Sequence, residues 1–195
     1  EENLTCYKPI NHTLWQDYEK GLISQQDIFT RRFSLFLNEF QIHEDGAKVE
    51  DIYRKYLNHG HETMPHAREL LSTLHQKGYK LYIGTNGVGI TQRTRLKAAK
   101  LGAYFEKLFI SEEINCQKPN ADFFTYIFEA LGTDQKEDFL MVGDRLTSDI
   151  QGAVNVGIDS VWFNPSGSLP TADSSKSTYT ISDLMQLIDV VETHN

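Results

Sequence analysis

The chain has 195 residues, of which 39% are hydrophobic and 24% are charged, and its formal net charge is −8. This is the composition of an ordinary globular protein, long enough for one domain or for a core with a modest insertion. The negative charge argues against binding a nucleic acid polymer, and no apolar run is long enough to span a membrane. Two cysteines without metal-site spacing, Cys6 and Cys116, favour a reduced, cytoplasmic protein.

The sequence opens with "EENLTC" and has no methionine at its start, since its methionines are Met64, Met141 and Met185. We therefore expect the chain to begin inside a longer gene product or to follow a cleavage.

The first sixty or so residues predict an all-helical unit. The stretch "TLWQDYEKG" ends at Gly21, a residue type that often terminates helices. Ser24 and Asp27 have the spacing of a capping pair at the start of the next helix, whose apolar residues recur with a helical period. Because no strand pattern occurs before Met64, residues 1–62 are expected to form one helical unit.

Residues 63–195 alternate between strand and helix patterns. Strands are expected within 79–84, 107–110, 138–143 and 160–164, with helices between them and after the last. This order predicts an α/β fold with a Rossmann-like parallel sheet covered by helices on both faces, in addition to the helical unit. In such sheets, ligands bind beyond the carboxyl ends of the strands.

The first candidate site follows the strand that ends in "YIGTNG". Thr85, Asn86 and Gly87 offer a hydroxyl, an amide and open backbone N–H groups, which together suit a phosphate. The same residue types also form simple turns at strand ends, so a purely structural turn is the alternative.

The second candidate is Lys118, which precedes Pro119 and a predicted helix. A lysine held at this edge of the sheet could neutralise an anionic intermediate. Most lysines are solvated surface residues, so that interpretation stays open for Lys118 taken alone.

The third candidate lies in "FLMVGDRLTSDIQGA". Asp144 follows a predicted buried strand, and Asp149 is expected in the first turn of the next helix. Two carboxylates this close suit Mg²⁺, which binds one or two carboxylates together with phosphate and water. Asp149 could instead cap its helix, but capping explains neither Asp144 nor the glycine before it. We therefore favour a metal site.

Three histidines, His59, His61 and His66, lie between the helical unit and the α/β unit. The segment lacks further cysteines or histidines at zinc spacing, so it is interpreted as a polar hinge.

The three sites occur in order at successive strand ends, and in this the sequence resembles the haloacid dehalogenase-like hydrolases, most of which are phosphatases. "YIGTNG", "QKPNADFF" and "MVGDRLTSDIQGAVNVG" resemble the second, third and fourth motifs of that family. "LFISEEINCQKPNADFF" and "INHTLWQDYEKGLIS" are similar to its bacterial pyrimidine 5'-nucleotidase branch. The resemblance covers nearly the whole chain.

The first motif of the family, Asp-x-Asp on the first core strand, does not occur in this sequence. The resemblance implies that this strand precedes the helical unit, carries the nucleophile and the general acid and base, and lies between the strands of "YIGTNG" and "MVGD". The chain is therefore expected to be truncated and inactive by itself. Loss of a central strand exposes apolar surface, so an expressed 195-residue chain is expected to be unstable or to aggregate.

The resemblance also implies roles for the candidate residues. Asp144 would bind Mg²⁺, and Asp149 would bind it through water or orient the groups around it. Thr85, Asn86 and Gly87 would bind the phosphoryl group, and Lys118 would bridge it to the nucleophile.

The helical unit would be a cap that selects the leaving group of a small phosphorylated substrate. Trp15, Phe29, Arg31 and Arg32 are its candidate contacts, although Phe29 also fits the apolar face of its helix and adjacent arginines often lie in solvent.

Other functions stay open from the sequence. The substrate could be another small phosphate ester, such as a sugar phosphate or phosphoglycolate. A dehalogenase would share the fold and the nucleophile but would not need Mg²⁺, so sensitivity to EDTA separates the two. A catalytically silent, phosphate-binding member is the non-enzymatic alternative.

Overall fold

The computed structural model describes residues 2–133, 135–168 and 176–194. The chain divides into two compact units, Glu1–Gly60 and His61–Asn195. The sequence pattern places the division at residue 62, and the structure places it between Gly60 and His61, inside the histidine-containing segment.

The first unit consists of three helices, α1 (Glu2–Glu19), α2 (Gln25–Glu39) and α3 (Gly46–His59). The capping pair at the start of α2 is confirmed, because the Ser24 side chain accepts from the Asp27 backbone and the Asp27 side chain accepts from the Ser24 backbone. Leu14, Tyr18 and Ile28 are buried between α1 and α2. The prediction of an all-helical unit is confirmed for the part of this segment that the structure describes.

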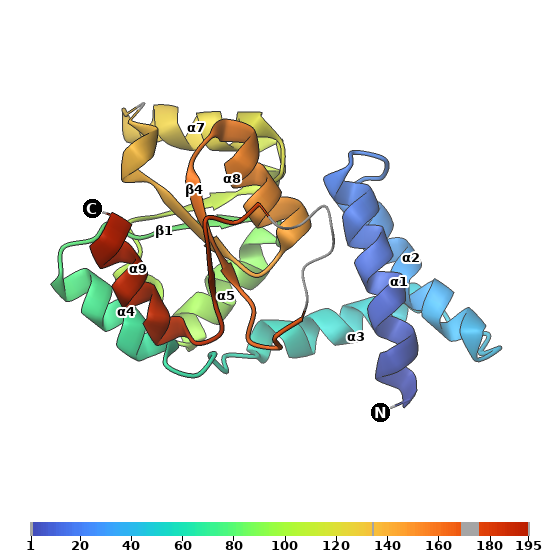
Figure 1. The fold of residues 1–195 in the computed structure, drawn as a ribbon. Coiled ribbons are helices and arrows are strands. Elements are labelled where there is room, and N and C mark those ends of the chain that lie inside the picture. The colour runs from blue at the N-terminus through green and yellow to red at the C-terminus, as the bar shows by residue number, and fades with distance from the viewer. Residues whose placement is uncertain (1, 134, 169–175, 195) are drawn as a thin grey trace. The chain divides into compact units, whose positions relative to one another are not determined.

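The second unit alternates strands and helices, as Figure 1 shows. Its strands are β1 (Tyr82–Thr85), β2 (Lys107–Ile110), β3 (Leu140–Gly143), β4 (Asp159–Phe163) and β5 (Tyr179–Ile181). Its α-helices are α4 (Ala67–Gln76), α5 (Gly89–Ala98), α6 (Ser111–Ile114), α7 (Ala121–Leu131), α8 (Gln151–Val156) and α9 (Leu187–His194). Short 3₁₀ turns lie at Gly102–Tyr104, Lys136–Asp138 and Leu184–Gln186, and a π-helical turn at Leu146–Ile150 leads into α8.

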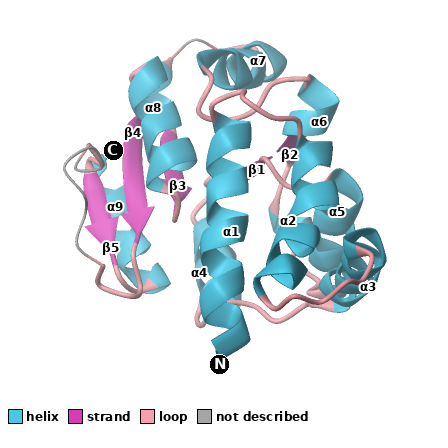
Figure 2. Cartoon of the chain, turned by 90° about the vertical axis from the view of Figure 1, so that its right-hand side faces the viewer, coloured by secondary structure: helices cyan, strands magenta, loops and turns pink. Residues whose placement is uncertain are grey.

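The strands form two parallel sheets. β1 pairs with β2, with Thr85 opposite Ile110, and β4 pairs with both β3 and β5. Within the described residues, β1 and β3 are not bonded to each other, so each is an edge strand of its own sheet. Figure 2 shows β3, β4 and β5 as one group, with β1 and β2 apart from it.

Helices cover the strands on both faces, which confirms the predicted α/β architecture. On one face, α4 and α9 pack against β4 and β5 around Leu74, Val161 and Val190. On the other face, α7 and α8 pack around Phe109 and Phe123, and Figure 1 shows the two helix pairs on opposite sides of the strands.

Two features differ from the sequence-based expectation. β5 is a three-residue strand that the pattern does not indicate, because a segment this short has too few positions to show alternation. β3, expected to be buried, is half-exposed at every position, as is β1, whereas the middle three residues of β4 are buried. Both β1 and β3 lie at an edge of their sheet, whereas β4 lies between β3 and β5. No helix in the described part of the chain is long and apolar enough to cross a membrane.

Candidate active site

The candidate site forms where β1 and β3 end, and Lys118 joins the two. Its Nζ atom donates to the carbonyl oxygen of Gly84 in β1 and to Oδ1 of Asp149, which follows β3, both at 2.6 Å. The carboxyl ends of the two sheets are therefore linked through one side chain. The structure thus brings together the strand-end segments that carry Gly84, Lys118 and Asp149.

Lys118 and Asp149 are a buried ion pair, with 5% and 6% of their surfaces exposed. A buried ammonium is stable only when it is paired and hydrogen-bonded, and here a carboxylate and a carbonyl meet that need. The structure thus decides against the solvated-surface interpretation of Lys118.

Asp149 is held by two contacts that occupy both of its carboxylate oxygens. Oδ1 accepts from Lys118, and Oδ2 accepts from the backbone N–H of Arg145 at 3.1 Å. This arrangement favours the role in which Asp149 orients neighbouring groups. It leaves Asp144 as the carboxylate that faces solvent at this edge.

Gly143 explains the glycine before Asp144. A Cβ atom at this position would overlap the Asp149 side chain, so only glycine lets that carboxylate pack against the end of β3. The carbonyl oxygen of Asp144 accepts from the indole Nε1 of Trp162 in β4, at 3.1 Å. The backbone that carries Asp144 is therefore fixed from the neighbouring strand.

The donor set fits a magnesium ion in part. Mg²⁺ requires one or two protein carboxylates and completes its shell with water and substrate phosphate, which the exposed Asp144 and the nearby Asp149 allow. The described residues contain no cluster of three or more potential metal-binding side chains, so a fuller shell needs oxygen atoms from elsewhere.

The "TNG" segment after β1 has a defined structure. The Thr85 hydroxyl accepts from the Gly87 backbone N–H at 2.9 Å and keeps its own proton for donation. The Asn86 side chain binds the backbone of Lys118 through both its oxygen and its nitrogen, each at 2.9 Å. Phosphate binding by these three residues stays a prediction. The Asn86 amide also has a structural role, because it binds the Lys118 backbone.

Cys116, two residues before Lys118, is a poor nucleophile in this setting. Burial, aided by the nearby Asp122, raises the pKa of its thiol above the usual range. The reactive thiolate is therefore scarce at neutral pH.

The cap candidates all lie in the first unit. Arg32 is 4% exposed and binds the two carboxylate oxygens of Glu50 at 2.6 and 2.7 Å, so its guanidinium has a structural role within the unit. Arg31 is exposed, and Trp15 is half-buried against Tyr18.

Phe29 is half-buried and lies beneath the Arg54 guanidinium, 3.7 Å from the ring centre. The cation–π contact gives Phe29 a structural role as well. Substrate contact by any of the four candidates stays a prediction.

The histidines near the unit boundary have contacts other than a shared metal. Nδ1 of His59 lies 2.6 Å from the carbonyl oxygen of Lys55, and Nδ1 of His66 lies 3.0 Å from the Asp183 carboxylate.

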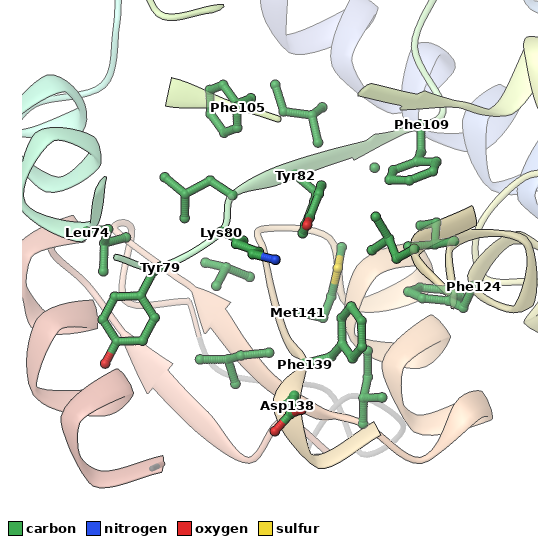
Figure 3. Close-up of a pocket in the computed structure, with 18 of the residues that line it drawn as sticks. Leu74, Tyr79, Lys80, Tyr82, Phe105, Phe109, Phe124, Asp138, Phe139 and Met141 are labelled. Carbon is green, nitrogen blue, oxygen red and sulfur yellow. The ribbon is translucent and has the colours of Figure 1, made fainter. Parts of the chain in front are cut away.

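An apolar cavity of about 850 Å³ separates β1 from β3. Continuous runs of both edge segments line it, residues 78–84 and 138–142, so backbone as well as side chains face the space. Figure 3 shows Tyr82 and Met141 in the middle of the cavity, with Phe109 and Phe124 toward one end. Small-molecule sites have similar volumes, but two parallel strand edges facing one apolar space are also the geometry that accepts a further strand.

Sequence reasoning missed two residues that shape the site, Trp162 and Asn155. Nδ2 of Asn155 donates to the carbonyl oxygen of Pro119 at 2.9 Å. Trp162 reads as an ordinary core residue of a strand, and only the structure shows where its N–H points. Asn155 is part of the "NVG" pattern at the end of α8, which signals the motif but not the contact.

Comparison with known proteins assigns the family. A family model described as haloacid dehalogenase-like hydrolase matches residues 6–163. The chain belongs to the haloacid dehalogenase-like hydrolases. It is 38% identical to the HAD-hydrolase YfnB of Bacillus subtilis over 189 residues, which are 97% of this chain and 80% of YfnB. A crystal structure of YfnB described as bound to magnesium superposes with a TM-score of 0.91, at 36% identity, and covers 98% of this chain and 83% of that one.

Two relatives in this family bear a more specific name. The pyrimidine 5'-nucleotidase PynA of Streptococcus pneumoniae is 38% identical over 95% of this chain and 78% of its own length. The pyrimidine 5'-nucleotidase YjjG of Escherichia coli is 31% identical over 99% of this chain and 84% of its own length. The resemblance stated from the motifs is confirmed at the level of the family.

Proposed function

We propose that this haloacid dehalogenase-like hydrolase is a Mg²⁺-dependent phosphatase that acts on pyrimidine nucleoside 5'-monophosphates. The observation that carries the proposal is the buried Lys118–Asp149 pair beside the exposed Asp144, at the edge where β1 and β3 end. A fixed cation next to an open carboxylate suits a phosphoryl group that gains charge during transfer. The names of PynA and YjjG support the choice of substrate class.

The chemistry needs a nucleophile that the three strand-end motifs do not contain. We infer that an aspartate of the family's first strand attacks phosphorus and displaces the nucleoside, whose 5'-oxygen takes a proton from the general acid of that strand. Water then hydrolyses the aspartyl phosphate, which releases inorganic phosphate and restores the carboxylate. The Thr85 hydroxyl would donate to a phosphoryl oxygen, and Lys118 would offset negative charge near the attacking carboxylate. Asp144 would hold Mg²⁺, which when bound would lower the charge on the phosphoryl oxygens.

The cavity between β1 and β3 supports this assignment of the first strand. Its walls are two parallel edges with mostly apolar side chains, and its lining runs to Gly84 in β1 and to Val142 in β3, two residues before Asp144. An apolar strand in this space would join both sheets and bring its last residues beside Lys118 and Asp144. The helical unit, Glu1–Gly60, would act as the cap.

Phosphate release tests the proposal. The product of the complete gene and the 195-residue chain are each incubated with UMP, dUMP, dTMP and a sugar phosphate, with Mg²⁺ or with EDTA. We expect metal-dependent release from the pyrimidine nucleotides by the complete product and none by the 195-residue chain. Lys118→Ala in the complete product should slow release about 100- to 1000-fold.

Each alternative gives a different result. Phosphate release from the sugar phosphate alone would indicate a sugar phosphatase instead of a nucleotidase. EDTA-insensitive halide release from a 2-haloacid would indicate a dehalogenase. Release by the 195-residue chain itself would refute the inference about the first strand. No turnover of any substrate by the complete product would leave a silent, phosphate-binding protein.

A further inference from the structure

The turn formed by Lys118 and Pro119 is held from two sides by asparagine side chains. Asn86 accepts from the Lys118 backbone N–H and donates to the Lys118 carbonyl, both at 2.9 Å. Asn155 donates to the Pro119 carbonyl at 2.9 Å. Three consecutive polar groups of the turn are therefore fixed by two side chains.

The two asparagines come from different elements on either side of the turn. Asn86 follows β1 directly, while Asn155 lies in α8. Nε2 of Gln151 donates to Oδ1 of Asn155 at 2.7 Å, so the Asn155 oxygen is occupied and its nitrogen is directed at Pro119. A Cβ atom at Gly152 would lie 3.5 Å from the Pro119 Cα, so α8 runs close beneath the turn.

The hydrogen bonds from Asn86 and Asn155 to this backbone bear on the position of the Lys118 side chain. A lysine side chain is flexible, and its ammonium reaches a defined place only if its backbone is fixed. Here the ammonium bridges Gly84 and Asp149 across the ends of both sheets. Movement of the turn would lengthen both of these contacts together.

We propose that Asn86 and Asn155 are positioning residues that set the place of the Lys118 ammonium during phosphoryl transfer. This inference rests on the proposed phosphatase function and gives Asn86 a task other than direct phosphate binding. A positioning residue acts only through the group it positions. Its effect on turnover must therefore disappear when that group is absent.

A double-mutant cycle in the product of the complete gene tests this point. Asn86→Ala and Asn155→Ala are each made in the wild-type and in the Lys118→Ala background. In the wild type we expect kcat to fall about 10- to 100-fold for Asn86→Ala, the range typical of groups that orient an active-site residue, with KM nearly unchanged. Asn155→Ala, which removes one hydrogen bond to the turn where Asn86→Ala removes two, should have the smaller effect.

In the Lys118→Ala background, neither asparagine substitution should lower kcat further by more than about twofold. Asn120→Ala is the matched control, because Asn120 lies in the same turn but caps α7 by accepting from the Asp122 backbone. It should leave kcat unchanged. Additive losses in the Lys118→Ala background, or a loss confined to KM, would overturn the proposal and favour direct phosphate binding by Asn86.

A second measurement needs no activity and so separates this inference from the proposed function. Lysine acetylation of the purified wild-type protein and variants is followed by mass spectrometry, residue by residue. Lys118 should react several-fold faster in Asn86→Ala than in the wild type or in Asn120→Ala, while the other lysines keep their rates. Equal acetylation rates of Lys118 in all three proteins would refute the positioning role of Asn86, even if no phosphatase substrate is found. An absence of turnover with the expected Lys118 rates would refute the function alone.

Discussion

Replacement of Glu50 by glutamine tests whether Arg32 has a structural role or is available to a substrate. The Glu50 carboxylate binds Arg32 on both oxygens and also Arg54, at 2.9 Å, and both Arg32 and Glu50 are buried. Glutamine keeps the shape but removes the charge, which leaves a buried guanidinium without its counter-ion. Loss of one partner of a buried pair costs about 3–5 kcal/mol.

That loss is large against the stability of the unit. A unit that spans Glu1–Gly60 has a free energy of unfolding of about 3–9 kcal/mol at the usual 0.05–0.15 kcal/mol per residue. Glu50→Gln is therefore expected to remove between a third of this stability and all of it. A double replacement, Arg32→Met with Glu50→Leu, should be less harmful than the single one, because the buried guanidinium is removed together with its counter-ion; Arg54, which also loses Glu50, is partly exposed.

Hydrogen exchange measured by mass spectrometry reads this effect separately for each unit. Peptides from α1, α2 and α3 should lose protection in Glu50→Gln, while peptides from residues 61–194 should not. Glu192→Gln is the matched control, because the Lys77–Glu192 pair has the same 2.6 Å separation but is about half-exposed. It should change protection little, since solvent screens such pairs. Unchanged protection of the first unit in Glu50→Gln would refute the structural role and return Arg32 to the list of substrate contacts.

Two further substitutions test the carboxyl end of β3. Gly143→Ala should destabilise the second unit by about 1–3 kcal/mol, because the new methyl group must displace the Asp149 side chain; an unchanged midpoint of urea unfolding would contradict the close approach. Trp162→Phe removes the donor to the Asp144 carbonyl and should cost about 1–3 kcal/mol in the same assay. If Trp162→Phe unfolds at the wild-type urea concentration, that hydrogen bond is not formed in solution.

The elements and their order could be predicted from the sequence because they depend on local patterns. The spacing of Ser24 and Asp27 alone indicates the start of α2, and apolar runs predict four of the five strands. The half-exposure of β1 and β3 does not follow from their apolar runs. An apolar run shows what a strand prefers to contact, whereas burial depends on whether a neighbour is present.

The site could be predicted as a set of residues but not as a set of contacts. The sequence predicts Thr85, Lys118 and Asp149 as site residues because each lies beyond a strand end, and parallel strands bring such ends together. Nothing in the spacing shows that Lys118 is buried or that Asn86 binds its backbone. These are contacts between segments about thirty residues apart, and many turns would satisfy the same local pattern.

The contacts also show why the site depends on all of its segments at once. Burial of the Lys118 ammonium is unfavourable by several kcal/mol unless Asp149 and the Gly84 carbonyl both meet it. Asp149 in turn reaches Lys118 only because residue 143 is glycine. Between β1 and β3, where no backbone ladder joins the two sheets in the described residues, this chain of polar contacts connects them. A change at any one member therefore weakens the others, which is why the predicted effects at Asn86, Gly143 and Lys118 should be coupled instead of additive.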